Sequence, residues 1–223
     1  MHSFWIKTPR FIRFLFPNYL WKINNKPHKL FLTFDDGPIP EITEWVLDIL
    51  NQESIKATFF CIGENIQKNP KIFKRILSEG HAVGNHTYNH LNGWKKNNSD
   101  YIKNFKLCEE IIKVSKQTIE KSNDNIKKEN SLLFRPPYGK IKPTASRYIR
   151  KKKHKIIMWD VLSYDFDSSI SPQQCYENVI NNVRSGSIIV FHDSLKAAKN
   201  MQYTLPKAIQ FLKKKGFVFE TIN

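Results

Sequence analysis

Short runs of apolar residues alternate with longer amphipathic segments along most of this chain. The apolar runs cover residues 30–34, 57–62, 132–134, 155–159, 187–191 and 217–220, with a further short run at 81–84. Helical patterns lie between them, over residues 41–52, 70–78, 99–121, 143–153, 172–184 and 205–215. Apolar strands that alternate with helices are typical of parallel βαβ units, whose strands are buried on both faces. The pattern predicts an α/β fold of six or seven such units, either a barrel or a doubly wound sheet.

Proline and glycine positions support several of these boundaries. Pro70, Pro143 and Pro172 stand where the first turn of a helix accepts proline, and Gly216 stands where a helix ends. Residues 122–130 are polar and rich in Asn and Lys, which predicts an exposed loop before the next strand.

The length of 223 residues suits one large domain better than two small ones. We expect a single domain over residues 28–223, preceded by an N-terminal segment over residues 1–27 whose aromatic side chains pack on it. Residues 11–21 are rich in aromatic residues, but Arg13 and Pro17 interrupt them. The segment is therefore too short and broken for a transmembrane helix, and no small-residue cleavage site marks a signal peptide. An amphipathic segment at a membrane surface is the alternative, so a cytoplasmic and an envelope-associated protein both stay open.

Composition and charge narrow the classes of protein. Hydrophobic residues make up 40% of the chain, which suffices for a sizeable core and excludes a disordered chain. The net charge of +16 would suit a nucleic-acid binder or a protein that contacts an anionic cell envelope. No basic and aromatic motif of a nucleic-acid module accompanies it, so we expect no nucleic-acid partner, and we expect a monomer. Cys61, Cys108 and Cys175 stand far apart, and their odd number argues against a disulfide framework.

Polar residues that could take part in catalysis or metal binding follow several predicted strands. In parallel α/β folds, catalytic groups gather at this edge of the sheet. Asp35 and Asp36 end the run at 30–34, and adjacent carboxylates repel each other unless a cation or an arginine offsets them. His86 and His90 are four residues apart, a spacing that brings two imidazoles to one face of a helical turn. Two histidines and one aspartate would leave a divalent metal open positions for water and substrate.

Two later motifs could complete a catalytic site. Arg135, in Arg-Pro-Pro-Tyr-Gly, could hold a carboxylate through a bidentate contact, and the turn at Tyr138 could direct a backbone N–H at a developing oxyanion. His192, followed by Asp193, could act as a general acid, because the ordinary pKa of histidine lies near neutrality. Taken singly, each motif also has an ordinary structural interpretation as a turn, a proline-rich loop or a strand end.

The combination of TFDDGP, HTYNH, RPPYG and a late strand that ends in His-Asp resembles the NodB-homology polysaccharide deacetylases, the fourth carbohydrate esterase family. The resemblance runs from about Leu30 to Phe219 in the family's motif order. It implies an irregular (β/α) barrel of about seven units. It also implies a metal-dependent hydrolase that removes N-acetyl groups from a polysaccharide or oligosaccharide containing N-acetylglucosamine.

The resemblance also assigns expected roles to particular residues. Asp35 would be the general base, and Arg135 would pair with it. Asp36, His86 and His90 would hold a divalent metal ion, for which the resemblance favours Zn²⁺. The backbone N–H of Tyr138 would help to hold the oxyanion, and His192 would protonate the leaving amine.

One motif departs from the family pattern. The family usually has Asp-x-x-Asp-Trp, whose first Asp orients the catalytic histidine, and this chain has Leu162 at that position and Phe166 at the position of the Trp. The partner of His192 is therefore open. Asp165 is our first choice and Asp160 our second.

Several functional alternatives also stay open. Hydrolysis of O-acetyl esters would use the same site and would depend less on His192, because an alkoxide leaves more easily than an amine. An inactive metal-binding carbohydrate receptor is a further alternative. Peptidoglycan, chitin oligosaccharides and poly-N-acetylglucosamine are all candidate substrates. The candidates for stacking on sugar rings are Trp94, Tyr138, Tyr164 and Phe166.

Overall fold

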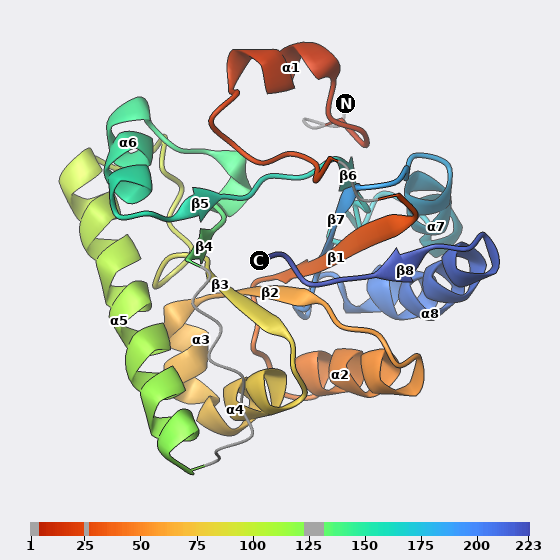
Figure 1. Cartoon of the computed structure of the whole chain (residues 1–223), viewed down its shortest axis with the longest axis horizontal. Coiled ribbons are helices and arrows are strands. Elements are labelled where there is room, and N and C mark those ends of the chain that lie inside the picture. The colour runs from red at the N-terminus through yellow and green to blue at the C-terminus, as the bar shows by residue number, and fades with distance from the viewer. Residues whose placement is uncertain (1–4, 25–26, 123–131) are drawn as a thin grey trace.

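A curled, parallel β-sheet with helices on its outer side forms the body of the protein (Figure 1). The computed structural model describes residues 5–24, 27–122 and 132–223. Seven strands follow the order β5-β4-β3-β2-β1-β7-β6, and β8 pairs with the start of β1. The strands are β1 Lys29–Asp35, β2 Thr58–Cys61, β3 Ala82–Asn85, β4 Leu133–Phe134, β5 Lys155–Ile156, β6 Val161–Leu162, β7 Ile188–His192 and β8 Val218–Phe219. This architecture confirms the expected irregular (β/α) barrel.

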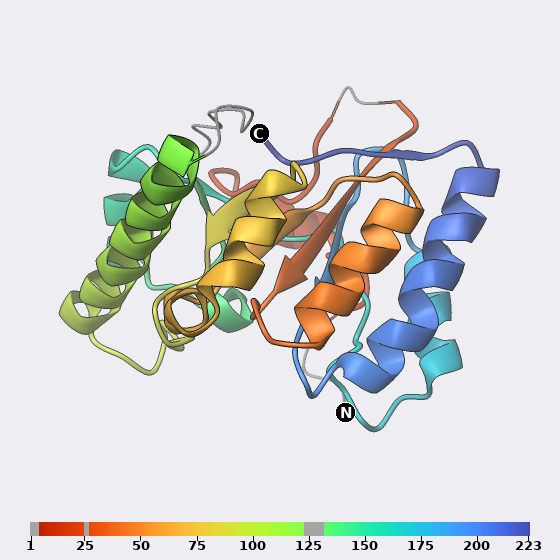
Figure 2. The same ribbon diagram turned by 90° about the horizontal axis from the view of Figure 1, so that it is seen from below.

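The helices mostly cover the outer face of the sheet, whereas the first of them stands apart from it (Figure 1). They are α1 Arg10–Leu15, α2 Ile42–Gln52, α3 Gly63–Lys68, α4 Pro70–Ser78, α5 Asn98–Ser122, α6 Pro143–Lys151, α7 Pro172–Ile180 and α8 Ala198–Lys214, with a short 3₁₀ turn at Pro137–Gly139. Figure 2 shows α5, α4, α2 and α8 side by side along one side of the sheet.

Several boundaries differ from the sequence-based expectation, and two elements were not predicted. The expected helix over 205–215 begins seven residues earlier, at Ala198, and so contains Pro206 in its interior. Buried Met201 and Thr204 favour this extension, because tertiary packing outweighs the local preference for proline at a helix start. Helix α3 and strand β6 were not predicted, because each is too short for a periodic pattern. The loop expected at 122–130 falls almost wholly outside the described residues.

Strand β1 shows how the fold places a carboxylate at the site. Its side chains alternate between the two faces of the sheet, as strand geometry requires. Leu30, Leu32 and Phe34 pack in the core beneath the helices, whereas Phe31 packs in the barrel interior. Asp35 continues the interior series, so this carboxylate lies inside the barrel at the carboxyl end of the strand.

The N-terminal segment lies along β6 and the chain that joins β5 to β6. Lys7 forms an antiparallel bridge with Val161, and the Leu20 N–H donates to the Ile156 carbonyl at 2.8 Å. Pairing of this kind covers a sheet edge that would otherwise be exposed. Trp21 is buried, but most other aromatic residues of the segment are not. The exposed ones are Trp5, Phe11, Phe14 and Phe16.

The three cysteines are free and buried, in agreement with the absence of a disulfide framework. Among the described residues, no helix is both long and apolar enough to span a lipid bilayer.

Candidate active site and metal cluster

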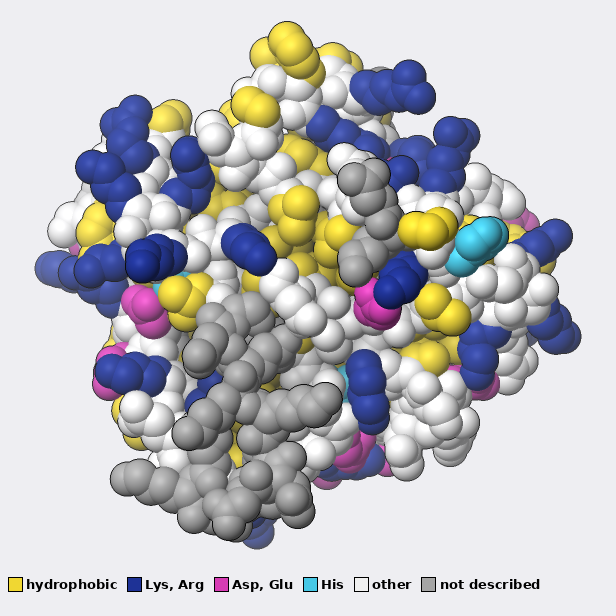
Figure 3. Space-filling model, viewed as in Figure 1, with side chains coloured by type: hydrophobic (Ala, Val, Ile, Leu, Met, Phe, Trp, Pro, Cys, Tyr) yellow, Lys and Arg dark blue, Asp and Glu magenta, His cyan; other side chains and the backbone are white. Residues whose placement is uncertain are grey.

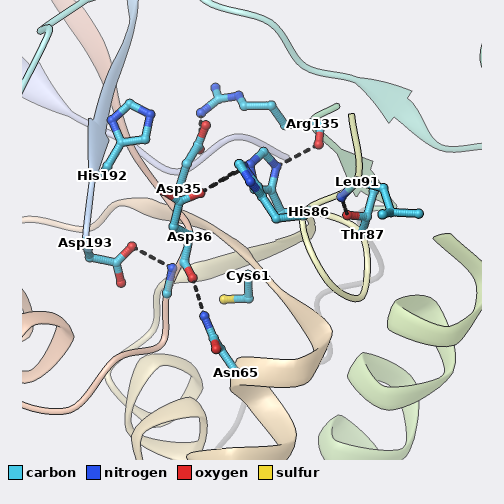
Figure 4. Close-up of polar contacts among 12 residues, drawn as sticks. Asp35, Asp36, Cys61, Asn65, His86, Thr87, Leu91, Arg135, His192 and Asp193 are labelled. Atoms are coloured by element: carbon cyan, nitrogen blue, oxygen red, sulfur yellow. Dashed lines mark hydrogen bonds and ion pairs between the residues drawn. The ribbon is translucent and has the colours of Figure 1, made fainter. Parts of the chain in front are cut away.

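Three side chains that could bind a metal converge at the carboxyl ends of β1 and β3. The Asp36 Oδ1 atom lies 3.2 Å from His90 Nε2 and 3.6 Å from His86 Nε2 (Figure 4). All three ligand atoms lie within 4.8 Å of one another. Around a tetrahedral metal with bonds of about 2.0–2.2 Å, neighbouring ligand atoms stand roughly 3.3–3.6 Å apart. Asp36 Oδ1 is also buried without a hydrogen-bond partner among the described residues, so the cluster fits a small divalent metal ion.

The two histidines meet in an irregular loop, and the expected helical turn is wrong. Thr87 and His90 both have a positive φ, of 65° and 59°. Such conformations cost about 1–3 kcal/mol per residue and persist where the surroundings enforce them. The Asn85 side chain accepts a hydrogen bond from the Thr87 N–H at 2.8 Å, and the Asn104 side chain accepts from the Tyr88 N–H at 2.9 Å. These amide side chains hold the loop that brings the imidazoles together.

Both imidazoles are kept neutral, the form that binds a metal. Burial, with a smaller contribution from the neighbouring His90, lowers the pKa of His86 to about 3. The His86 Nδ1–H donates to the Arg135 carbonyl at 2.7 Å, so the lone pair of Nε2 is directed toward Asp36. Burial also lowers the pKa of His90, although the Asp36 carboxylate opposes this effect.

Arg135 is fully buried and fixes Asp35 with one of its nitrogens. Its Nη1 donates to Asp35 Oδ1 at 2.6 Å and to the Thr33 hydroxyl at 2.7 Å. Its other nitrogens donate to the carbonyls of Ile157, at 3.2 Å, and Met158, at 3.0 Å. The expected bidentate contact is therefore wrong, because the remaining donors are used to hold the backbone after β5.

His192 stands beside Asp35, because the two residues are register partners on β7 and β1. Asp165 contacts His192 twice: its Oδ1 lies 2.8 Å from His192 Nδ1, and its Oδ2 accepts from the His192 backbone N–H at 2.6 Å. Asp160, the second choice, instead contacts Lys7, Arg13 and the Ser187 hydroxyl.

The environment of His192 favours its charged form. Burial alone would lower the pKa of His192, but the Asp165 carboxylate and its hydrogen bond, together with Asp36 and Asp35, raise it to about 9. The histidine therefore holds a proton at neutral pH, as a general acid must.

A cavity of about 430 Å³ joins these groups. Its lining comprises Asp35, Asp36, His86, His90, Pro136, Tyr138, Trp159, Leu162, Phe166, Val190, His192, Ser194 and Lys196. Of the four candidates for sugar stacking, Tyr138 and Phe166 line the cavity. Tyr164 is only 3% exposed and belongs to the core, so its expected role is wrong, and Trp94 is exposed outside the lining.

Two residues without a predicted role position the turn that carries Asp36. The buried Asp193 carboxylate accepts hydrogen bonds from the Gly37 N–H at 3.0 Å and from the Thr43 hydroxyl at 2.6 Å. The Asn65 side chain donates to the Asp36 carbonyl at 2.7 Å. The place of Asp193 directly after a strand was a usable signal, whereas nothing in the sequence distinguished Asn65.

Comparison with known proteins agrees with this geometry. A family model described as polysaccharide deacetylase matches residues 22–157. A peptidoglycan-N-acetylglucosamine deacetylase of Bacillus cereus is 34% identical over 204 residues, which cover 91% of this chain and 90% of that protein. The peptidoglycan-N-acetylmuramic acid deacetylase PdaA of Bacillus subtilis is 27% identical over 202 residues, covering 90% and 72% of the two chains. The crystal structure of the Bc1960 peptidoglycan N-acetylglucosamine deacetylase superposes with a TM-score of 0.81 at 34% identity, covering 96% of this chain and 95% of that one.

Replacement of Gly37 tests the role of the Asp193 support. A Cβ atom at position 37 would overlap the Asp193 carboxylate, so we expect Gly37→Ala to displace the turn that carries Asp36. The expected cost is about 1–3 kcal/mol of unfolding free energy, as for other overpacked sites, and zinc binding at least about tenfold weaker by calorimetry. Gly216→Ala is the control, because no atom lies near its Cβ position, so that variant changes only the backbone preference at a positive φ of 82°. Equal zinc affinity in the two variants would contradict the role of Asp193.

Proposed function

The chain belongs to the polysaccharide deacetylase family of hydrolases, and on that basis we propose that it removes N-acetyl groups from N-acetylglucosamine residues of peptidoglycan. The relatives named for this activity match the chain over nearly its whole length. The observation that carries the proposal is the pairing of Asp35 with His192 on adjacent strands, beside the metal cluster. A base and an acid are thus available at one cavity.

The proposed metal site consists of Asp36, His86 and His90. Two imidazoles and one carboxylate are a donor set that suits Zn²⁺ and leaves open positions. A divalent metal held there would supply a positive charge that polarises both a water molecule and the acetyl carbonyl.

Asp35 is the proposed general base. Its contact with the Arg135 guanidinium, at 2.6 Å, fixes the position of one carboxylate oxygen. Because Asp35 does not belong to the metal cluster, its carboxylate is free to accept a proton from the water that attacks the acetyl carbon. A new C–O bond forms in that step, and the carbonyl oxygen becomes negative.

The backbone N–H of Tyr138 is the proposed donor to this negative oxygen. Tyr138 lies in a turn with a φ of 59°, at the edge of the cavity, and its ring packs on His90 with centroids 4.6 Å apart. A backbone donor held by such a turn needs little reorganisation when charge develops.

His192 is the proposed general acid. The contact between its Nδ1 and Asp165 leaves Nε2 to donate a proton to the sugar nitrogen as the C–N bond breaks. Acetate and a free amine are the products. This contact supports amide hydrolysis over the O-acetyl ester alternative, because an amine needs protonation to leave. The presence of both a base and an acid also disfavours an inactive receptor.

The base is tested by Asp35→Asn. We expect turnover of an acetylated chitooligosaccharide to fall by about 10²–10⁴-fold, while zinc content, measured by atomic emission, is unchanged. Asp36→Asn is the matched control, because it should lose zinc as well as activity. Loss of zinc from Asp35→Asn would place Asp35 among the metal ligands and contradict the division of roles.

The acid is tested by the pH dependence of Asp165→Asn. His192 acts only while protonated, so activity should fall as the pH rises through its pKa, which Asp165 raises. Removing that negative charge lowers this pKa and should shift the basic limb of the kcat/KM profile to lower pH. A bound metal lowers the pKa in both proteins and does not change the direction. An unchanged basic limb would rule out Asp165 as the partner of His192.

The substrate is tested by acetate release from purified peptidoglycan, acetylated chitooligosaccharides and acetylated xylan, with added zinc. We expect acetate from peptidoglycan, and glucosamine in place of N-acetylglucosamine when the digested product is analysed by mass spectrometry. Deacetylated muramic acid would instead assign the chain the activity for which PdaA is named. Release from xylan alone would establish the ester alternative.

A further inference from the structure

Helix α1 exposes three of its four hydrophobic side chains and directs a charged side chain inward, while Ile12 packs on the core. Phe11, Phe14 and Leu15 have the i, i+3, i+4 spacing of one helix face, and they are 56%, 84% and 62% exposed. Arg13, on the opposite side, contacts the buried Asp160 carboxylate. A surface helix of a soluble domain normally has the reverse arrangement. The Trp5 ring packs edge-on against Phe11 with centroids 5.7 Å apart, and because Trp5 is itself 55% exposed, the two form one exposed apolar group with the face of α1.

This face is part of a larger patch. Of the thirteen large hydrophobic side chains that are exposed in the described part of the chain, six lie within residues 5–16. Single exposed hydrophobic residues are ordinary, but a contiguous group marks an interaction site. In Figure 3, hydrophobic side chains gather on the part of the molecule that projects at the top, where Figure 1 places α1. We call residues 5–16 the N-terminal patch.

The surroundings of the N-terminal patch are positively charged. Residues 1–34 contain no Asp or Glu and include six Lys or Arg residues. The segment is joined to α6 by a hydrogen bond of 2.9 Å between the Tyr19 hydroxyl and Ser146. Helix α6 and the residues after it add exposed basic side chains, namely Arg147, Arg150, Lys151, Lys152 and Lys153. An apolar face flanked by such charge is complementary to a surface that has anionic groups on its outside and an apolar interior beneath them.

We propose that the N-terminal patch docks the protein on the surface of an anionic phospholipid bilayer. Phe11, Phe14 and Leu15 enter the boundary between headgroups and acyl chains, and Arg10 and the basic residues of α6 contact lipid phosphates. A second copy of the chain is a poorer occupant, because two patches of like charge repel each other. Nucleic acid would match the charge but would leave the hydrophobic face uncovered.

Docking would also fix the position of the active-site cavity. The Leu162 N–H donates to the Ile6 carbonyl at 2.8 Å, and Leu162 lines the cavity. The N-terminal patch is thus connected to the cavity wall by one backbone hydrogen bond, so a docked protein would keep its cavity close to the membrane surface.

The test is sedimentation of the full chain with vesicles in 0.1 M salt. Vesicles of phosphatidylglycerol and phosphatidylcholine in equal amounts should bind the protein, and pure phosphatidylcholine should bind it at least about tenfold more weakly, as expected for electrostatic attraction. The triple variant Phe11→Ser, Phe14→Ser, Leu15→Ser should lose at least about tenfold in binding to the anionic vesicles. The matched control replaces exposed hydrophobic residues on α5, with Leu107→Ser and Val114→Ser, and should bind like the wild type.

Two double variants test how much the basic residues of α6 contribute to vesicle binding. Arg147→Gln with Arg150→Gln should weaken binding to the anionic vesicles, whereas Lys71→Gln with Lys74→Gln, exposed on α4, should not. Thermal melting and acetate release from a soluble oligosaccharide should be unchanged in all these variants, which separates docking from folding and catalysis. Equal binding to both vesicle types, or unchanged binding by the triple variant, would overturn the proposal. So would a wild-type dimer, detected by sedimentation velocity, that the triple variant abolishes without any vesicle binding.

Discussion

The buried guanidinium of Arg135 is the group on which the site depends. A charge without access to water is tolerated only where it is paired and its donors are satisfied. Arg135 meets this condition by contacting Asp35, Thr33 and the carbonyls of Ile157 and Met158. Its own carbonyl accepts a hydrogen bond from His86. One residue therefore connects the carboxylate of β1, the chain after β5 and a histidine of the metal cluster, so these parts cannot move independently.

Four carboxylates crowd the same edge of the sheet, and each has a different partner. Asp35 contacts an arginine, Asp36 faces two neutral imidazoles, Asp165 contacts His192, and Asp193 is held by a backbone N–H and a hydroxyl. Neighbouring carboxylates destabilise each other when they share an environment. Burial raises the pKa of Asp193 to about 8. The other three carboxylates lie beside side chains that can carry a positive charge or, in the case of Asp36, beside two imidazoles that could bind a metal cation. Distinct partners thus allow chemically identical groups to perform different tasks.

Much of the fold could be predicted from the sequence, because apolar runs mark buried strands and carboxyl ends of parallel strands meet at one edge. That rule also explains why Asp35 and His192, far apart in the chain, could be expected at one site. The loop that carries His86 could not be predicted, because its left-handed residues depend on a hydrogen bond that the Tyr88 N–H donates to the distant Asn104 side chain. Strand β6 was missed for a related reason: two residues show no periodicity, and only pairing with β7 defines them.

The position of Asp165 shows how His192 can keep a carboxylate partner although Leu162 stands where the family usually has an aspartate. Leu162 is a strand residue that lines the cavity, and its side chain has no atom that could accept a hydrogen bond. Asp165 lies in the turn that follows, where Tyr164 has a φ of 63° and where the Asn200 side chain donates to the Asp165 carbonyl. This turn brings both carboxylate oxygens to His192. A leucine in the cavity wall then leaves an apolar surface in the cavity that His192 also lines, which suits the methyl group of an acetyl better than a second carboxylate would.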